Sequence, residues 1–252
     1  VTAQESSIRV TELKTNYRTT PLSLGTHPYF YWQLKATNRD ATDLNQLAYK
    51  VQVTEKTGVI AWDSGRVNTS QSIQIKYDGA PLKSATRYTW KVTVWDQRNV
   101  RSDSESSWFE TGLSPSDWGG YWISMSNDVP KDDCAFYDKH PTPLLRKTFS
   151  IEKGKHVERA QMFVSGLGYY EMSINGQRVG DSILDPGWTS YNKRVLYSTY
   201  DIPKSIFGEV NAIGIVLGNG YYNPLPMKFF GGLNFRDYLV VGVPKAIVHL
   251  II

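Results

Sequence analysis

The sequence predicts an all-β protein built from two tandem β-sandwich domains. Tyr, Trp and Phe together make up 13% of the 252 residues, and aromatic residues favour strands over helices. The 20 Gly and 12 Pro residues supply the turns that many short strands need. At roughly 150 residues per domain, the length allows two domains, each large enough to bury a core of its own.

Residues 1–113 are expected to form a fibronectin III-like β-sandwich, because short alternating apolar runs are separated by turn residues. The expected strands are Ile8–Leu13, Tyr29–Leu34, Ala48–Thr54, Ile73–Ile75, Arg87–Trp95 and Ser107–Glu110. From Tyr88 to Val94 the even-numbered residues are apolar and the odd-numbered ones are polar, so one face is core and the other is wet. The Tyr88 hydroxyl is expected to reach upstream backbone, as in a tyrosine corner. With no Cys pair, the fibronectin III type fits better than a true immunoglobulin domain.

Residues 114–142 are expected to be a linker, because they are rich in turn residues and acids. Residues 143–252 then resume the strand pattern of a second sandwich. Its expected strands are Arg146–Ile151, Arg159–Ser165, Tyr169–Ile174, Gln177–Gly180, Val195–Asp201, Asn211–Leu217 and Ala246–Ile252. Asn175-Gly176 predicts a type I′ hairpin, and Lys204–Phe207 a single helical turn. The last apolar run has no closing turn, so this sandwich is expected to be incomplete at its C-terminal end.

Composition and charge exclude several classes of function. The net charge of +4 is spread along the chain without a long basic run, so nucleic acid is not an expected partner. No segment approaches the ~18 consecutive apolar residues of a membrane helix. The single cysteine, Cys134, excludes an internal disulfide framework. The small polar start of the chain suits a protein whose signal peptide has been removed, and we therefore expect a periplasmic or secreted location.

Catalytic and metal-binding patterns are weak. The densest acidic cluster is Glu171, Asp181 and Asp185, but Asp185-Pro-Gly is sufficiently explained as a turn, and we expect no catalytic residue in this chain. The histidines His27, His140, His156 and His249 lie in unrelated surroundings, without the spacing of a metal site or a nucleophilic triad. The Gly-rich segments at 218–220 and 231–232 do not open a helix after a strand, so they favour turns over a phosphate loop.

Aromatic and polar residues gather in two loops of the second domain. We expect a carbohydrate-binding surface formed by Trp188, Tyr191, Asn219, Tyr221 and Tyr222. A flat aromatic face beside hydrogen-bonding groups matches a pyranose, which has an apolar face and a rim of hydroxyls. The alternative is that these aromatic residues simply plug the end of the sandwich.

Ordered motifs across both domains resemble one protein family. The first domain carries the segments Ala61–Val67, Tyr77–Leu82, Thr86–Asp96 and Phe109–Leu113. The second domain carries Leu145–Phe149, Gly166–Glu171, Ile174–Asp181, Leu184–Tyr191, Tyr197–Asp201 and Leu217–Tyr222. Together they resemble the N-terminal fibronectin-like and jelly-roll domains of bacterial α-L-rhamnosidases of glycoside hydrolase family 78. The segment Pro224–Arg236 departs from the shorter loop that is usual in this family.

The resemblance implies a parent enzyme that hydrolyses terminal α-L-rhamnose from glycans or glycosides with inversion. Its catalytic residues would lie in an (α/α)6 barrel downstream, which nothing in this chain matches, so this chain by itself is not expected to be an enzyme. The expected partners are rhamnose-containing carbohydrate and that barrel. Some similar modules bind rhamnose through calcium, for which Asn219 and Asp181 have suitable oxygen atoms. Two alternatives are a stand-alone rhamnose-binding module and a fibronectin-type module that binds a protein.

Overall fold

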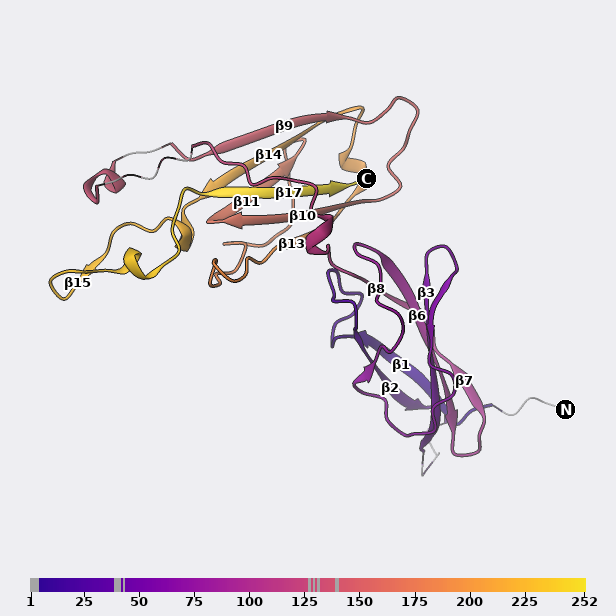
Figure 1. The fold of residues 1–252 in the computed structure, drawn as a ribbon. Coiled ribbons are helices and arrows are strands. Elements are labelled where there is room, and N and C mark those ends of the chain that lie inside the picture. Colours follow the sequence, from indigo (N-terminus) through magenta and orange to yellow (C-terminus); the bar gives the residue numbers. More distant parts are fainter. Residues whose placement is uncertain are drawn as a thin grey trace. The chain divides into compact units, whose positions relative to one another are not determined.

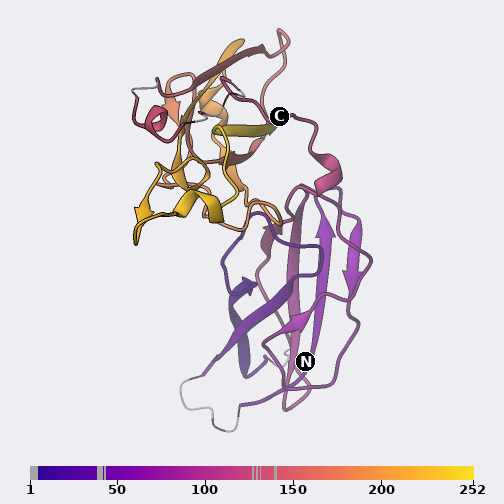
Figure 2. The ribbon, with the colours of Figure 1, turned by 60° about the vertical axis from the view of Figure 1, so that its left-hand side comes forward.

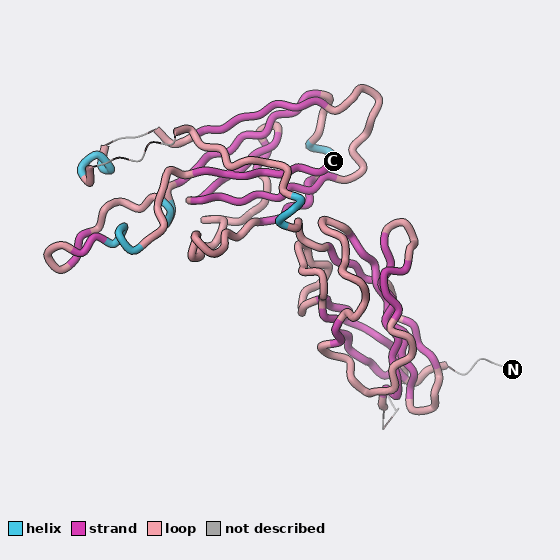
Figure 3. Tube along the Cα trace, viewed as in Figure 1, coloured by secondary structure: helices cyan, strands magenta, loops and turns pink. Residues whose placement is uncertain are grey.

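The chain forms two compact units, Val1–Asp117 and Trp118–Ile252. A computed structural model describes residues 5–38, 42, 44–126, 128, 130, 132–138 and 141–252. Strands dominate both units, and the helices are short 3₁₀ turns (Figure 3). None of the described helices is long and apolar enough to span a membrane. The boundary between the units falls inside the predicted linker, part of which (127, 129, 131, 139 and 140) lies outside the described residues.

The first unit is a sandwich of two antiparallel sheets (Figure 1). One sheet has the order β1-β2-β5, and the other has the order β4-β3-β6-β7 with β8 paired to β6. The strands are β1 (Ile8–Thr15), β2 (Tyr29–Ala36), β3 (Gln46–Glu55), β4 (Ile60–Asp63), β5 (Ile75–Lys76), β6 (Arg87–Asp96), β7 (Arg101–Asp103) and β8 (Ser107–Glu110). The prediction of an all-β tandem sandwich is therefore confirmed.

The core of the first unit follows the predicted alternation of β6. Tyr88, Trp90, Val92 and Val94 are all buried, whereas Thr89 and Lys91 are exposed. Thr93 was expected on the wet face and is nevertheless buried, and its hydroxyl donates to the Asp103 carboxylate of the neighbouring strand β7. The tyrosine corner is confirmed, since the Tyr88 hydroxyl accepts a bond of 2.9 Å from the backbone N–H of Lys83.

The second unit is a sandwich with sheets β13-β10-β17 and β12-β11-β14-β9 (Figures 1 and 2). Its strands are β9 (Leu144–Ser150), β10 (Ala160–Leu167), β11 (Tyr169–Ile174), β12 (Gln177–Arg178), β13 (Ser198–Ile202), β14 (Val210–Gly218) and β17 (Lys245–Ile251). Met162, Val164, Met172, Ile174 and Leu217 form much of the core between the two sheets. Asn175 and Gly176 both have positive φ, which confirms the predicted hairpin turn.

An arm formed by residues 224–240 extends from the second unit (Figures 1 and 2). It contains the two-stranded hairpin of β15 (Lys228–Phe229) and β16 (Leu233–Asn234), followed by η5 (Phe235–Tyr238). The Arg236 guanidinium lies 3.9 Å from the centre of the Phe136 ring and donates to Asn223 Oδ1 at 3.1 Å. Phe136 belongs to η2 (Cys134–Tyr137). These contacts fasten the arm to an earlier part of its own unit.

Other short elements complete the fold. They are η1 (Pro115–Asp117), η3 (Lys204–Ile206) and η4 (Gly220–Tyr222). The helical turn expected at Lys204–Phe207 is confirmed by η3. The strand expected at Ile73–Ile75 begins later, at Ile75, because Gln74 has a φ of 53° that interrupts extended backbone.

Candidate functional site

Four of the five predicted binding residues form two aromatic pairs in the second unit. The rings of Trp188 and Tyr221 stack with their centroids 5.0 Å apart and an interplanar angle of 29°. The rings of Tyr191 and Tyr222 meet edge to face at 5.5 Å. Trp188 is 51% exposed and Tyr221 is 45% exposed. This stacked pair therefore presents apolar ring surface to solvent, as a carbohydrate platform requires.

The second pair, Tyr191 and Tyr222, is less exposed than the stacked pair. Tyr222 is buried, and its ring lies so close to Gly242 that a Cβ there would come within 2.6 Å of the tyrosine oxygen. Tyr191 is half-buried. Burial raises the pKa of both hydroxyls above the ordinary tyrosine value. These two residues fit the alternative, in which the aromatic side chains close the end of the sandwich, better than a direct role in sugar binding.

Asn219 lies beside the aromatic pairs, where β14 ends and η4 begins. It is exposed, and its side-chain oxygen accepts a bond of 3.2 Å from the Asn223 amide. The following residue, Gly220, has positive φ, and a Cβ there would come within 3.2 Å of the Tyr169 ring. Sequence analysis missed Tyr169, whose place at the site depends on its pairing with Gly218 across two strands.

Asp185 anchors the loop that carries Trp188. Its carboxylate accepts bonds from Ser198 Oγ at 2.9 Å, from Tyr200 Oη at 2.9 Å and from the Tyr170 hydroxyl. Its backbone carbonyl accepts from the Tyr170 N–H at 3.1 Å. Burial and the bonds to Asp185 and Tyr200 raise the pKa of the Tyr170 hydroxyl well above its ordinary value. The turn interpretation of Asp185 was therefore incomplete, because its side chain is the centre of a hydrogen-bond network.

The other acidic and histidine residues do not converge on this site. Glu171 is exposed and lies 3.7 Å from Arg178. His27 is next to Thr26 in the first unit, His249 accepts from the Gly119 N–H, and His140 lies outside the described residues. Among the residues that the structure describes, no group of three or more His, Cys, Asp or Glu could hold a metal ion. Calcium binding through Asn219 and Asp181 stays a prediction.

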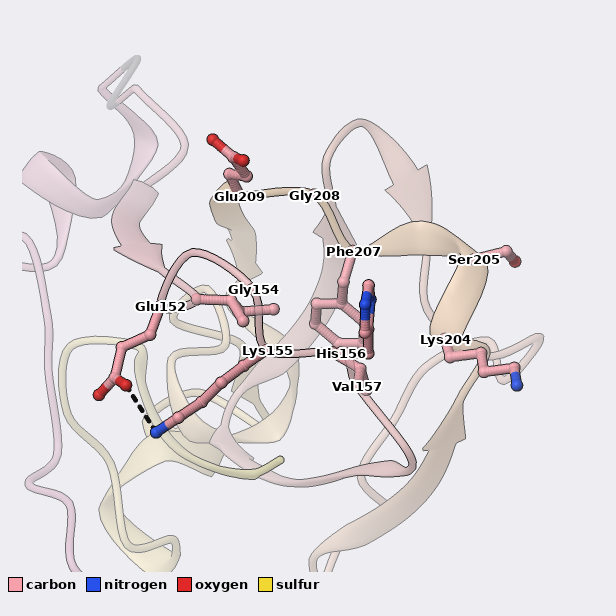
Figure 4. Close-up of a pocket in the computed structure, with 11 residues that line it drawn as sticks. Glu152, Gly154, Lys155, His156, Val157, Lys204, Ser205, Phe207, Gly208 and Glu209 are labelled. Carbon is pink, nitrogen blue, oxygen red and sulfur yellow. Dashed lines mark ion pairs between the residues drawn. The ribbon is translucent and has the colours of Figure 1, made fainter.

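A cavity of about 580 Å³ lies elsewhere in the second unit, between the loops 151–157 and 204–209. These loops adjoin the end of β14 where Val210 pairs with Ser150, whereas the aromatic pairs adjoin its other end. Figure 4 shows Phe207, His156 and Val157 together in the cavity, while Lys204, Ser205 and Glu209 point away from them. A ligand site needs converging polar groups, so the aromatic pairs remain the better candidate.

Comparisons with known proteins match both units. Residues 10–115 match a family described as the Rha78A-like, N-terminal immunoglobulin domain. Residues 155–243 match the alpha-L-rhamnosidase N-terminal domain. A curated alpha-L-rhamnosidase of Formosa agariphila is 35% identical over 239 residues, which are 86% of this chain and 25% of the relative. The chain thus spans about a quarter of the length of that relative.

Solved structures agree with these matches. An alpha-L-rhamnosidase structure from Dictyoglumus thermophilum is 34% identical, with a TM-score of 0.78, and the match covers 96% of this chain and 27% of that one. The Streptomyces avermitilis alpha-L-rhamnosidase complexed with L-rhamnose also has a TM-score of 0.78, over 96% of this chain and 39% of that one. At 21% identity, the second structure supports the fold alone. The chain belongs to the α-L-rhamnosidase family, and its two units match the N-terminal immunoglobulin domain and the N-terminal domain of that family.

Proposed function

We propose that the second unit is the part of this chain that packs against the catalytic portion of a rhamnoside-cleaving parent enzyme. The supporting observation is an asymmetry of exposed apolar surface between the two units. Among the described residues, 22 large apolar side chains are exposed in the second unit and six in the first. Soluble proteins rarely expose large contiguous apolar patches without an interaction to cover them. The two units are similar in length, so size does not explain the difference.

The arm is the most exposed apolar part of the second unit. Phe230 is fully exposed at the tip of the hairpin, and Tyr238 is 70% exposed. The arm is nonetheless fastened at its base, where the Tyr137 hydroxyl donates to the Pro226 carbonyl at 2.6 Å and Lys228 pairs with Asp133 at 2.9 Å. A fastened segment that presents apolar side chains pays less conformational entropy on docking. These properties support packing of the arm against the larger remaining portion.

Hydroxyl-radical footprinting tests this proposal on the isolated chain and on the full-length parent enzyme. We expect Phe230 and Tyr238 to be labelled in the isolated chain and protected in the parent. Ile60 of the first unit, which is 54% exposed, is the internal control and should be labelled in both. Equal labelling of the arm in the two proteins would show that nothing in the parent covers it.

We further propose that Trp188, Tyr221 and Asn219 contact rhamnose-containing carbohydrate, with Tyr191 and Tyr222 supporting them. The exposed stacked pair beside an exposed amide supports this assignment. A rhamnose titration followed by tryptophan fluorescence should show a change that Trp188→Ala abolishes. Trp122→Ala is the matched control, because Trp122 is also exposed and lies in the same unit. No fluorescence change in the unmutated chain would refute the binding role.

The two alternatives are not favoured. Both family matches are to domains of α-L-rhamnosidases, and the relatives are several times longer than this chain. That context argues against a stand-alone sugar-binding module and against an independent protein-binding module. Assignment of the first unit to the fibronectin III type is a proposal supported by its lack of cysteine. The matching family is described as an immunoglobulin domain.

A further inference from the structure

The first unit has a polar trough on the outer face of its larger sheet. The trough has a volume of about 270 Å³ and is lined by Lys50, Gln52, Lys91, Thr93, Trp95 and Arg101. Strand pairing explains this grouping, since Lys50 lies opposite Thr93 and Gln52 lies opposite Lys91 across β3 and β6. Trp95 lies opposite Arg101 across β6 and β7. Short Thr93 forms the floor between these longer side chains.

The trough carries an excess of positive charge. Lys50 pairs with Asp63 at 2.7 Å, and Arg101 pairs with Asp103 at 2.6 Å. Among the described residues, no carboxylate forms an ion pair with Lys91. A further cation lies at the Trp95 wall, where the Arg66 guanidinium is 4.6 Å from the ring centre. The three cations that line the trough, Lys50, Lys91 and Arg101, therefore face two carboxylates.

The existing ion pairs do not close the trough to an anionic ligand. The side chains of Lys50 and Asp63 are 37% and 31% exposed, and those of Arg101 and Asp103 are 63% and 45% exposed. Ion pairs this exposed contribute about 0–1 kcal/mol each. An entering carboxylate can therefore share or replace a partner at low cost, and Lys91, which lies close enough to Asp103 to help lower the pKa of that carboxyl, makes no ion pair among the described residues.

We propose that this trough binds a saccharide bearing carboxylate groups. The carboxylates would be held by Lys91, Lys50 and Arg101, because charge-assisted hydrogen bonds are the strongest that such a surface can offer. The Gln52 amide, whose nitrogen donates to Asp63 at 3.2 Å, presents a carbonyl oxygen that suits sugar hydroxyls, and the Trp95 ring supplies an apolar wall. A neutral sugar would leave the cations unused, and a simple inorganic anion would leave the wall unused. This site lies in the first unit and does not depend on the proposed role of the second.

Isothermal titration of the whole chain with oligogalacturonate tests the proposal. A neutral galactan oligomer of the same length and a polyglutamate peptide serve as comparison ligands. We expect the uronate oligomer alone to bind. Its affinity should fall steeply with added salt, since the Debye length shrinks from about 30 Å at 0.01 M to about 3 Å at 1 M.

The variant Lys91→Gln should weaken uronate binding by about two- to five-fold, in line with one exposed charge contact. Lys35→Gln is the matched control, because Lys35 is an exposed lysine of β2 in the other sheet. Equal thermal unfolding of the two variants would verify that both fold. Absence of uronate binding, equal binding of polyglutamate, or the same loss in both variants would overturn the proposal.

Discussion

Replacement of Asp185 by alanine should loosen the loop that carries Trp188. The carboxylate accepts side-chain hydrogen bonds from Tyr170, Tyr200 and Ser198, which lie on β11 and β13. Other described anchors of the loop are the ring contacts of Trp188 with Tyr221 and of Tyr191 with Tyr222, which leave Trp188 half exposed. Removal of the carboxylate leaves the buried Tyr170 hydroxyl with Tyr200 as its remaining described side-chain partner, at 3.2 Å.

The size of the effect follows from these three bonds. Hydrogen bonds to a charged group contribute about 1.5–3 kcal/mol each, and partial exposure of Asp185 places them near the lower value. Asp185→Ala should therefore cost about 4 kcal/mol of local stability. Asp185→Asn keeps the shape and an acceptor oxygen but loses the charge, which roughly halves each bond. It should cost about 2 kcal/mol.

Hydrogen–deuterium exchange measured on peptides spanning 185–194 reports the free energy of local opening. About 4 kcal/mol corresponds to an exchange rate faster by up to about three orders of magnitude, with Asp185→Asn intermediate. Asp181→Ala is the control, because Asp181 is an exposed carboxylate in the preceding segment. A change of less than tenfold for Asp185→Ala would refute the idea that this network holds the loop.

Three further predictions concern stability. Burial raises the pKa of Asp96, but bonds from Ser7, Val100 and Arg98 outweigh burial and lower it overall. The stabilisation that ionised Asp96 gives the folded state is complete above about pH 4 and is lost as the pH falls. Asp96→Asn should therefore make the free energy of unfolding in urea less dependent on pH in the acid range; an unchanged dependence would contradict this. Arg236→Ala should speed proteolysis of the arm without lowering the melting temperature of the cores; protection equal to that of the unmutated chain would argue against the Phe136 contact as its anchor. Ile174→Ala, at a fully buried site, should cost the second unit about 2–5 kcal/mol and leave the transition of the first unit in place; a loss below about 1 kcal/mol would contradict its core role.

Local signals in the sequence were sufficient for much of the fold. The alternation along β6 predicted its buried face, and Asn175-Gly176 predicted a hairpin turn with two positive φ angles. Two short strands of the first unit, β4 and β7, escaped prediction. Arg101–Asp103 is polar throughout and becomes β7 because it pairs with β6. Pairing of this kind depends on a distant partner, which periodicity within a segment does not reveal.

The candidate site was likewise predictable from the sequence only in part. Residue type alone suggested that Trp188, Tyr191, Tyr221 and Tyr222 share one surface, and in the structure they form two contacting pairs, while their role in sugar binding stays a prediction. Which pair is exposed depends on how two loops pack, so the burial of Tyr222 was not predictable. The role of Asp185 was missed for a related reason. The Asp-Pro-Gly sequence was explained sufficiently by a turn. The three hydroxyls that donate to the Asp185 carboxylate come from strands distant in the sequence.

The high aromatic content predicted strands, but it serves opposite purposes in the two units. In the first unit, large rings fill the core, including Phe30, Trp32, Tyr88, Trp90 and Phe109. In the second unit, Leu, Ile, Val and Met supply most of the core. Its exposed aromatic residues are Tyr121, Trp122, Tyr137, Trp188, Tyr221, Phe229, Phe230 and Tyr238. Truncation of a buried ring costs about 3–5 kcal/mol of stability, whereas truncation of an exposed ring removes binding surface. Alanine at a buried ring of the first unit, such as Trp90, should therefore destabilise that unit, whereas alanine at an exposed ring of the second unit, such as Phe230, should leave it folded and remove contact surface.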